Sequence, residues 1–273
     1  MKNDPTSNPL RIFYGSPCLL MSLLLMLAQP LTAANEEHLA ILKDAEQSRG
    51  DLGRQGIVWI VSALTEEGGE QKMMRLKVIT QSSNVFAEII DPEKSRGTKY
   101  IVADGNMWFH KPSLSRPISI SRRQRVMGNA AVGDVAAISF LHDYEVEAVE
   151  EGTHENETCH VFTLKGVTKA ASYPLIRYWV SKKRHVGTRA EFYSVSGAKL
   201  RTAFMKYGHK LNIDGRNRDF LSEMIVEENL GSTKSTKLTF GDFGLQQFPE
   251  ETFKKDSLAP DKKIRPGGPK RPF

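Results

Sequence analysis

Few residues in this sequence have the types and spacing that catalysis or metal binding requires. The densest group of potential metal ligands comprises His154, Glu155, Glu157, Cys159 and His160. Cys159 and His160 are neighbours on an expected strand, so their side chains should point to opposite faces, which suits a single ion poorly. We therefore expect a solvated loop here and no metal site.

Other chemical motifs are weaker. Asp214–Asp219 resembles a calcium loop only loosely, because the acidic spacing and the closing Glu are missing, and a tight turn is the better reading. The sequence contains no glycine-rich phosphate loop, nucleophile elbow or metalloprotease helix. We therefore expect a protein that is not an enzyme and that needs no cofactor.

A basic run, Arg122, Arg123 and Arg125, follows a short expected strand. Such a run could contact anionic head groups or an acidic partner surface. The alternative is an ordinary solvated loop, since charge runs usually face water.

The elements that would position these residues are mostly strands. From Gly56 onward, apolar side chains recur with a period of two, and turn residues separate the segments. About a dozen short strands without alternating helices predict a large antiparallel sheet, closed or half closed. An amphipathic helix is expected over Glu36–Arg49, with Gly50 as its stop, and an irregular or helical interruption over Gly133–His142.

The clearest local signal is Asp104-Gly105 between Tyr100–Ala103 and Asn106–Phe109. Asp-Gly between two apolar runs predicts a hairpin with a two-residue type I′ turn, which pairs Ile101 with Trp108 and Tyr100 with Phe109. Both faces of this hairpin then carry large apolar groups. Each face must be covered by another part of the chain.

The chain ends have a different composition. A charged leader, the apolar run Cys18–Leu27 and a small-residue exit predict a signal peptide over residues 1–34, with an uncleaved anchor as the alternative. The stretch Ala259–Phe273 is rich in Pro, Gly and Lys and is expected to be a disordered basic tail. Of the formal net charge of +6, most belongs to these ends, so the body, residues 35–258, lacks the basic face that nucleic-acid binding requires.

Several of these segments, in this order, resemble a known family. Asp91-Pro92, Arg96-Gly97-Thr98, the run from Asp104 to Pro112, and Met127-Gly128 are similar to the outer-membrane lipoprotein-sorting proteins, relatives of the periplasmic carrier LolA. The chain departs from those carriers at Ser82-Ser83, where they have an Arg-Pro pair, and at His110, where they tend to have a second aromatic residue.

The resemblance implies a mainly β fold, an incomplete, strongly curved antiparallel β-barrel whose concave face is covered by helices. It also implies a monomeric periplasmic carrier that binds lipid or lipoprotein acyl chains and moves them toward the outer membrane. An inner-membrane transporter, an outer-membrane acceptor and transient contact with a membrane surface would be its partners. The alternative is an accessory binding module that docks to an envelope transporter, such as an RND-type exporter, and carries nothing.

On this fold we expect six large side chains to line the cavity and two leucines of the first helix to cover it. The lining residues are Trp59, Phe86, Ile101, Trp108, Phe140 and Trp179, and the covering residues are Leu39 and Leu42.

Overall fold

The structure, a computed structural model, describes residues 30–67, 70–121, 125–127, 130–131, 140–213, 215–229 and 234–258. Contacts divide the chain into two units, Met1–Ala40 and Ile41–Phe273. In the described part, the first unit consists of the start of helix α2 (Pro30–Ser48). Most of the expected signal peptide, and the expected tail over 259–273, lie outside the described residues. No helix within the described ranges has the length and apolarity needed to cross a membrane.

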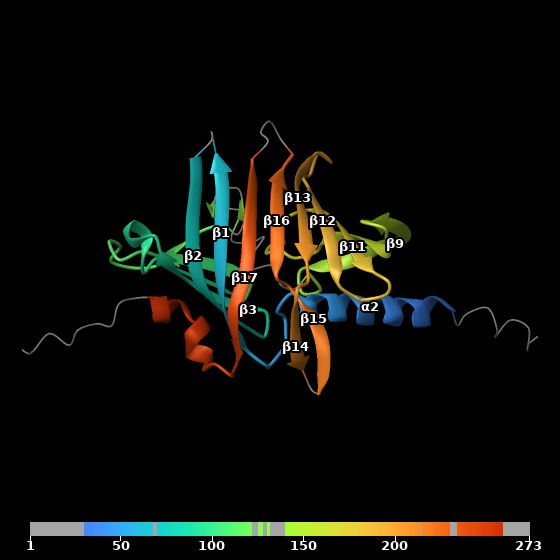
Figure 1. Ribbon diagram of the computed structural model, residues 1–273, viewed down its shortest axis with the longest axis horizontal. Helices are drawn as coiled ribbons and strands as arrows, with labels where there is room; N and C mark the ends of the chain where they lie inside the picture. Colours follow the sequence, from blue (N-terminus) through green and yellow to red (C-terminus); the bar gives the residue numbers. More distant parts are fainter. Residues whose placement is uncertain are drawn as a thin grey trace, which may run out of the picture. The chain divides into compact units, whose positions relative to one another are not determined.

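The second unit is built on one open antiparallel sheet of 13 strands (Figure 1). Its strand order is β6-β5-β4-β3-β2-β1-β17-β16-β13-β12-β11-β10-β9, so β6 and β9 are the edges and the sheet does not close into a barrel. The predicted mainly β, incomplete antiparallel architecture is therefore confirmed. The strands are β1 (Ile57–Glu67), β2 (Glu70–Gln81), β3 (Asn84–Asp91), β4 (Lys99–Ala103), β5 (Asn106–His110), β6 (Ile118–Ser119), β9 (Tyr144–His154), β10 (Glu157–Gly166), β11 (Leu175–Ser181), β12 (Gly187–Tyr193), β13 (Lys199–Lys206), β16 (Glu223–Glu228) and β17 (Ser235–Leu245).

Two short hairpins stand apart from this sheet. One joins β7 (Arg125–Met127) to β8 (Ala130–Ala131), and the other joins β14 (His209–Ile213) to β15 (Arg216–Phe220). The sequence predicted only a turn at the second of these, because its strands are short and polar. The turn itself is present, with Gly215 in the left-handed region at φ 77°.

The hairpin of β4 and β5 has the predicted register. Ile101 pairs with Trp108 and Tyr100 with Phe109, across a turn in which Asp104 and Gly105 both have positive φ. Tyr100 and Met107 belong to the main core cluster, whereas Ile101 and Trp108 belong to a second cluster. Because neighbouring residues of a strand point to opposite faces, the two clusters lie on opposite sides of the sheet.

The end of α2 covers the first of these faces. Ile41, Leu42 and Ala45 are buried in the main cluster together with residues of strands from β1 to β17. The helix ends at Ser48, and Gly50 (φ 113°) provides the predicted stop. The expected helix is thus confirmed, although it begins at Pro30 and not at Glu36.

The C-terminal segment covers the second face. The 3₁₀ helices η2 (Glu250–Phe253) and η3 (Lys255–Leu258) contact β3, β4 and β5 (Figure 1). They bury Phe253 and Leu258 against Ile101, with Trp108 packed beside them. Each apolar face of the hairpin of β4 and β5 is therefore covered. One face packs in the main core cluster, and η2 and η3 cover the other.

An ionic contact fixes the last turns of α2. The carboxylate of Asp44 accepts hydrogen bonds from Arg218 of β15, at 2.6 Å, and from His185 of the β11–β12 turn, at 3.1 Å. Partial burial acts to raise the pKa of Asp44, but the hydrogen bonds and charges of Arg218 and His185 outweigh it and hold that pKa below its ordinary value of 3.8. Asp44 therefore joins the helix to two separate hairpin elements.

The cover over Ile101 and Trp108 predicts a specific loss of stability. Phe253→Ala removes a buried ring from the second cluster and should lower the free energy of unfolding by about 3 kcal/mol, measured by urea denaturation. Lys255→Ala, on the exposed side of the same segment, should change it by less than about 0.5 kcal/mol. Equal effects of the two changes would contradict the assigned cover.

The contacts of Asp44 predict a pH-dependent effect. A carboxylate whose folded pKa is depressed stabilises the fold above its unfolded pKa, and this contribution disappears as the pH falls through the folded value. Asp44→Asn should therefore cost up to about 1 kcal/mol at neutral pH, and the difference from the wild type should shrink below about pH 4. Asp256→Asn, at an exposed position, is the matched control. A difference that stays constant with pH would argue against the ionic contact.

Candidate functional site

The main core cluster encloses an apolar interior between one face of the sheet and the end of α2. Its remaining space is lined by Ala190 and Phe192 of β12, Ala203 and Met205 of β13, and Met224 of β16, with Arg49 and Phe140 above them. The cavity volume is about 10 Å³, which is room for no more than about one water molecule. The interior is therefore almost filled by side chains, and its walls are apolar apart from Arg49.

The residues that follow Phe140 close this interior. The Phe140 ring packs edge-on against Tyr144 and Tyr178, with centroids 5.8 Å and 5.2 Å away. Its backbone N–H donates to Oε1 of Glu46, and the N–H of Leu141 donates to the same oxygen at 2.8 Å. One buried carboxylate on α2 thus holds the start of this segment over the interior.

Arg49 supplies the opposite charge. Its guanidinium lies over the Phe140 ring, 4.3 Å from the centroid, and Nη1 donates to the Tyr178 hydroxyl at 3.5 Å. Burial alone would lower the pKa of Arg49, but interactions with Tyr178, Tyr207 and Glu46 raise it, so the side chain stays charged although only 4% exposed. The charged pair Glu46 and Arg49 lies at the rim of the apolar interior.

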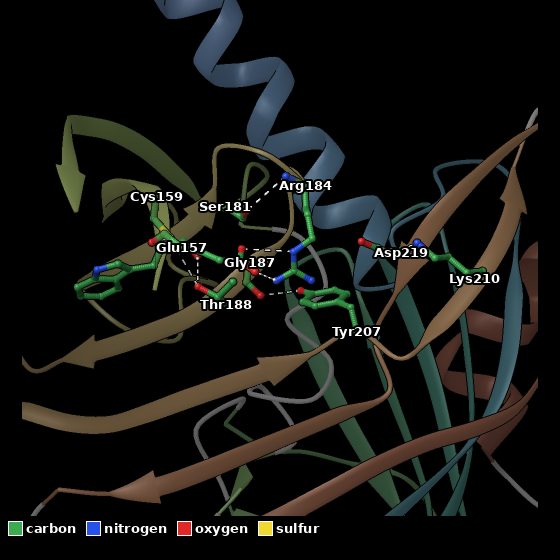
Figure 2. Close-up of polar contacts among 10 residues, drawn as sticks. Glu157, Cys159, Ser181, Arg184, Gly187, Thr188, Tyr207, Lys210 and Asp219 are labelled. Carbon is green, nitrogen blue, oxygen red and sulfur yellow. Dashed lines mark hydrogen bonds and ion pairs between the residues drawn. The ribbon is translucent and has the colours of Figure 1, made fainter. Parts of the chain in front are cut away.

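A half-buried polar contact lies beside Tyr178. Tyr207 donates its hydroxyl to the carbonyl of Gly187 at 2.8 Å, as Figure 2 shows. Burial raises the pKa of both Tyr178 and Tyr207, so both phenols remain protonated. Gly187 is required at this position, because a Cβ would lie 1.7 Å from the Tyr178 hydroxyl.

The six side chains expected to line one cavity do not come together. Trp59 and Phe140 belong to the main cluster, Phe86, Ile101 and Trp108 to the cluster under η2 and η3, and Trp179 to a third cluster with Cys159 and Val161. The physical reason is strand alternation, since choosing residues by size alone mixes the two faces of the sheet. Of the expected covering residues, Leu42 is buried in the main cluster, whereas Leu39, in the N-terminal unit, is 46% exposed.

The other candidate residues have separate surroundings. Arg122 and Arg123 lie outside the described residues, and of Arg125 only the backbone, in β7, is described. Glu157 pairs with Arg184 at 2.7 Å, and the Cys159 thiol lies 3.9 Å from the Thr188 hydroxyl (Figure 2). Within the described ranges, no group of three or more His, Cys, Asp and Glu residues is placed to hold a metal ion.

Glu46 and Arg49 are the residues that sequence reasoning missed. They continue the apolar stripe of Leu42 and Ala45 at helical spacing, so two charges occupy the face that the helix buries. A charge on an otherwise apolar helix face is a detectable signal, because buried charges need specific partners.

The geometry can be compared with known proteins. A family model described as an uncharacterized protein matches residues 81–260, more than half of the chain. A LolA superfamily protein from Nitrosomonas europaea is 29% identical, with a TM-score of 0.69 over 80% of this chain and 98% of that one. A search of curated proteins found no match.

Two further solved structures share the fold at lower identity. An outer membrane lipoprotein-sorting protein domain from Vibrio parahaemolyticus is 20% identical, with a TM-score of 0.64 over 81% of this chain and 97% of that one. A DUF1329 family protein from Desulfovibrio piger is 18% identical, with a TM-score of 0.65 over 80% of this chain and 98% of that one. The chain belongs to the matched DUF1329-like family, and its fold is similar to that of the LolA superfamily protein.

Proposed function

We propose that this protein is a periplasmic carrier that binds lipid or lipoprotein acyl chains in its apolar interior and moves them toward the outer membrane. The observation that supports this most is the apolar interior beneath a cover whose first two backbone amides both donate to the Glu46 carboxylate. Binding in such an interior needs no catalytic group, because burial of apolar surface supplies the free energy.

The free energies of the hydrogen bonds and of acyl-chain burial are consistent with a cargo that opens the cover itself. Displacing the Phe140 segment breaks two hydrogen bonds to a charged acceptor, which together are worth about 3–6 kcal/mol. Each buried CH₂ group contributes about 0.8 kcal/mol, so burial of about four to eight CH₂ groups would offset the loss of these two hydrogen bonds. Short chains would leave the cover closed.

In this proposal residues 1–34 direct export to the periplasm, residues 35–258 form the carrier domain and residues 259–273 a basic tail. The carrier acts as a monomer, receives cargo from an inner-membrane transporter and delivers it to an outer-membrane acceptor. Arg122, Arg123 and Arg125 are candidates for contact with a partner or with head groups. Leu42 covers the interior.

A second candidate function is an accessory module that docks to an envelope transporter of the RND type and carries nothing. The small cavity volume favours it, since a domain without cargo would keep its interior filled. The two functions differ in whether the interior ever takes up a chain.

Lipid recovery separates these functions. Mass spectrometry of organic extracts from the exported protein should show bound lipid, and the stripped protein should take up a fluorescent long-chain fatty acid. Recovery of no lipid together with no uptake would overturn the carrier. If the protein is instead a docking module, reversing the charges of Arg122, Arg123 and Arg125 should abolish co-purification with the transporter.

The role of Glu46 gives a residue-level prediction. Glu46→Ala leaves the amides of Phe140 and Leu141 without their acceptor, so their hydrogen exchange should accelerate roughly tenfold or more, and fatty-acid uptake should become faster. Glu46→Gln retains one acceptor oxygen, so its hydrogen-exchange and uptake rates should lie between those of the wild type and those of Glu46→Ala. Glu227→Ala, at an exposed position of β16, should change neither rate. Unchanged exchange in Glu46→Ala would remove the proposed closing contact.

A further inference from the structure

A second cavity lies beside the closed interior. It has a volume of about 500 Å³ and is formed by the last turns of α2, the loop Asp51–Arg54, the turn Ser82-Ser83 and Leu141. We call it the α2 groove. Its size is within the range of small-molecule sites, and the Glu46 carboxylate that holds the cover is part of its wall.

The charged side chains that line the α2 groove differ in their partners. Asp51 accepts hydrogen bonds from the Gly53 N–H at 3.2 Å and from the Ser83 hydroxyl at 2.9 Å, and Glu46 is occupied by the two cover amides. Lys43 and Arg54 also line the groove, and neither side chain has an ion-pair partner among the residues that the structure describes. Among the described residues, the groove therefore carries two positive charges without an ion-pair partner, Lys43 and Arg54, beside the carboxylates of Glu46 and Asp51, of which Asp51 is hydrogen-bonded by the uncharged Gly53 N–H and Ser83 hydroxyl.

An unsatisfied acceptor lies in the same wall. Oε1 of Gln47 is buried and has no hydrogen-bond partner within the described part of the chain. A buried amide oxygen without a donor costs about 1–3 kcal/mol. Rotation of the Gln47 side chain toward the groove would let a ligand that carries an N–H or O–H group remove this cost.

The floor of the α2 groove is held in place by core packing, and its edge is held by a backbone hydrogen bond. Leu52 and Leu141 line it and pack against the main core cluster, so its apolar floor is continuous with the interior. Ser82 and Ser83 have φ values of 49° and 61°, which are unfavourable for residues other than glycine. The Ser82 N–H donates to the Gly53 carbonyl at 2.7 Å, which holds the strained turn against the loop. Strain of this kind is concentrated at functional sites.

We propose that the α2 groove binds the anionic head group of an amphiphile, with the anion between Lys43 and Arg54, a hydroxyl or amide N–H of the ligand on Gln47, and the start of its apolar chain on Leu52 and Leu141. The inference rests on the proposed carrier function and names its cargo class as anionic lipids. Binding there places the head group beside Glu46, where the chain enters the interior.

Two lipids with the same chain test this assignment. Oleoyl lysophosphatidic acid has a phosphate and a hydroxyl group, whereas monoolein has the same chain without the phosphate. The full-length exported protein should bind the first at least tenfold more tightly in calorimetry, and high salt should reduce this preference. Glycerol 3-phosphate and inorganic phosphate, which lack the chain, should bind far more weakly.

Substitutions in the α2 groove test whether the head group binds there. Lys43→Ala/Arg54→Ala should lower the affinity for lysophosphatidic acid at least tenfold and leave monoolein binding unchanged. Gln47→Met should weaken lysophosphatidic acid binding several-fold without destabilising the fold, because it removes an unsatisfied acceptor. Arg75→Ala/Lys77→Ala removes the same charge from exposed positions of β2 and should have no effect.

The outcomes distinguish the two proposals. Equal binding of both lipids, unaffected by Lys43→Ala/Arg54→Ala, would overturn the head-group site and leave the carrier intact. Binding of neither lipid would overturn the carrier. Binding of inorganic phosphate as tight as that of lysophosphatidic acid would show a site for free anions and overturn the assignment to an amphiphile.

Discussion

An open sheet with large apolar groups on both faces can be stable only if each face is covered. The constraint is clearest at the hairpin of β4 and β5, where Met107 points to one side and Trp108 to the other. Closed barrels avoid sheet edges, but this sheet ends at β6 and β9 and uses separate covers. The end of α2 closes one face, and η2 with η3 closes the other. The α2 cover differs in that it brings two buried charged side chains, Glu46 and Arg49, to the face that it closes.

Those charges connect the fold to the proposed function. Glu46 and Arg49 both lie on the buried face of α2, where an isolated charge would be costly. Glu46 is satisfied by two backbone amides and Arg49 by aromatic faces and a phenol hydroxyl. The cover combines this polar contact with the buried Phe140 ring, so opening it breaks two hydrogen bonds and also exposes one aromatic side chain. In a carrier, burial of cargo would have to offset both losses.

The interior and the α2 groove have complementary chemistry. One is apolar and almost filled, and the other is open, with exposed cations beside a buried amide oxygen. Glu46, which accepts from the Phe140 amide, lines the groove, and the apolar residues Leu52 and Leu141 connect the groove floor to the core. An amphiphile has the same division into a polar and an apolar part, which is why the two cavities together suit one class of ligand.

Local chemistry determined much of this protein. The alternation of apolar residues predicted the antiparallel sheet, Asp104-Gly105 predicted a turn and a register that are both confirmed, and Gly50 marked the end of the helix. These features depend on residues close together in the sequence. Only the tertiary structure decided which face each strand presents to the interior, so Trp108 and Trp179 lie in different clusters from Trp59. It also decided that Glu46 meets Phe140, 94 residues away. Such contacts depend on how the sheet curves and on which segment covers it, and no local pattern of residue types encodes either.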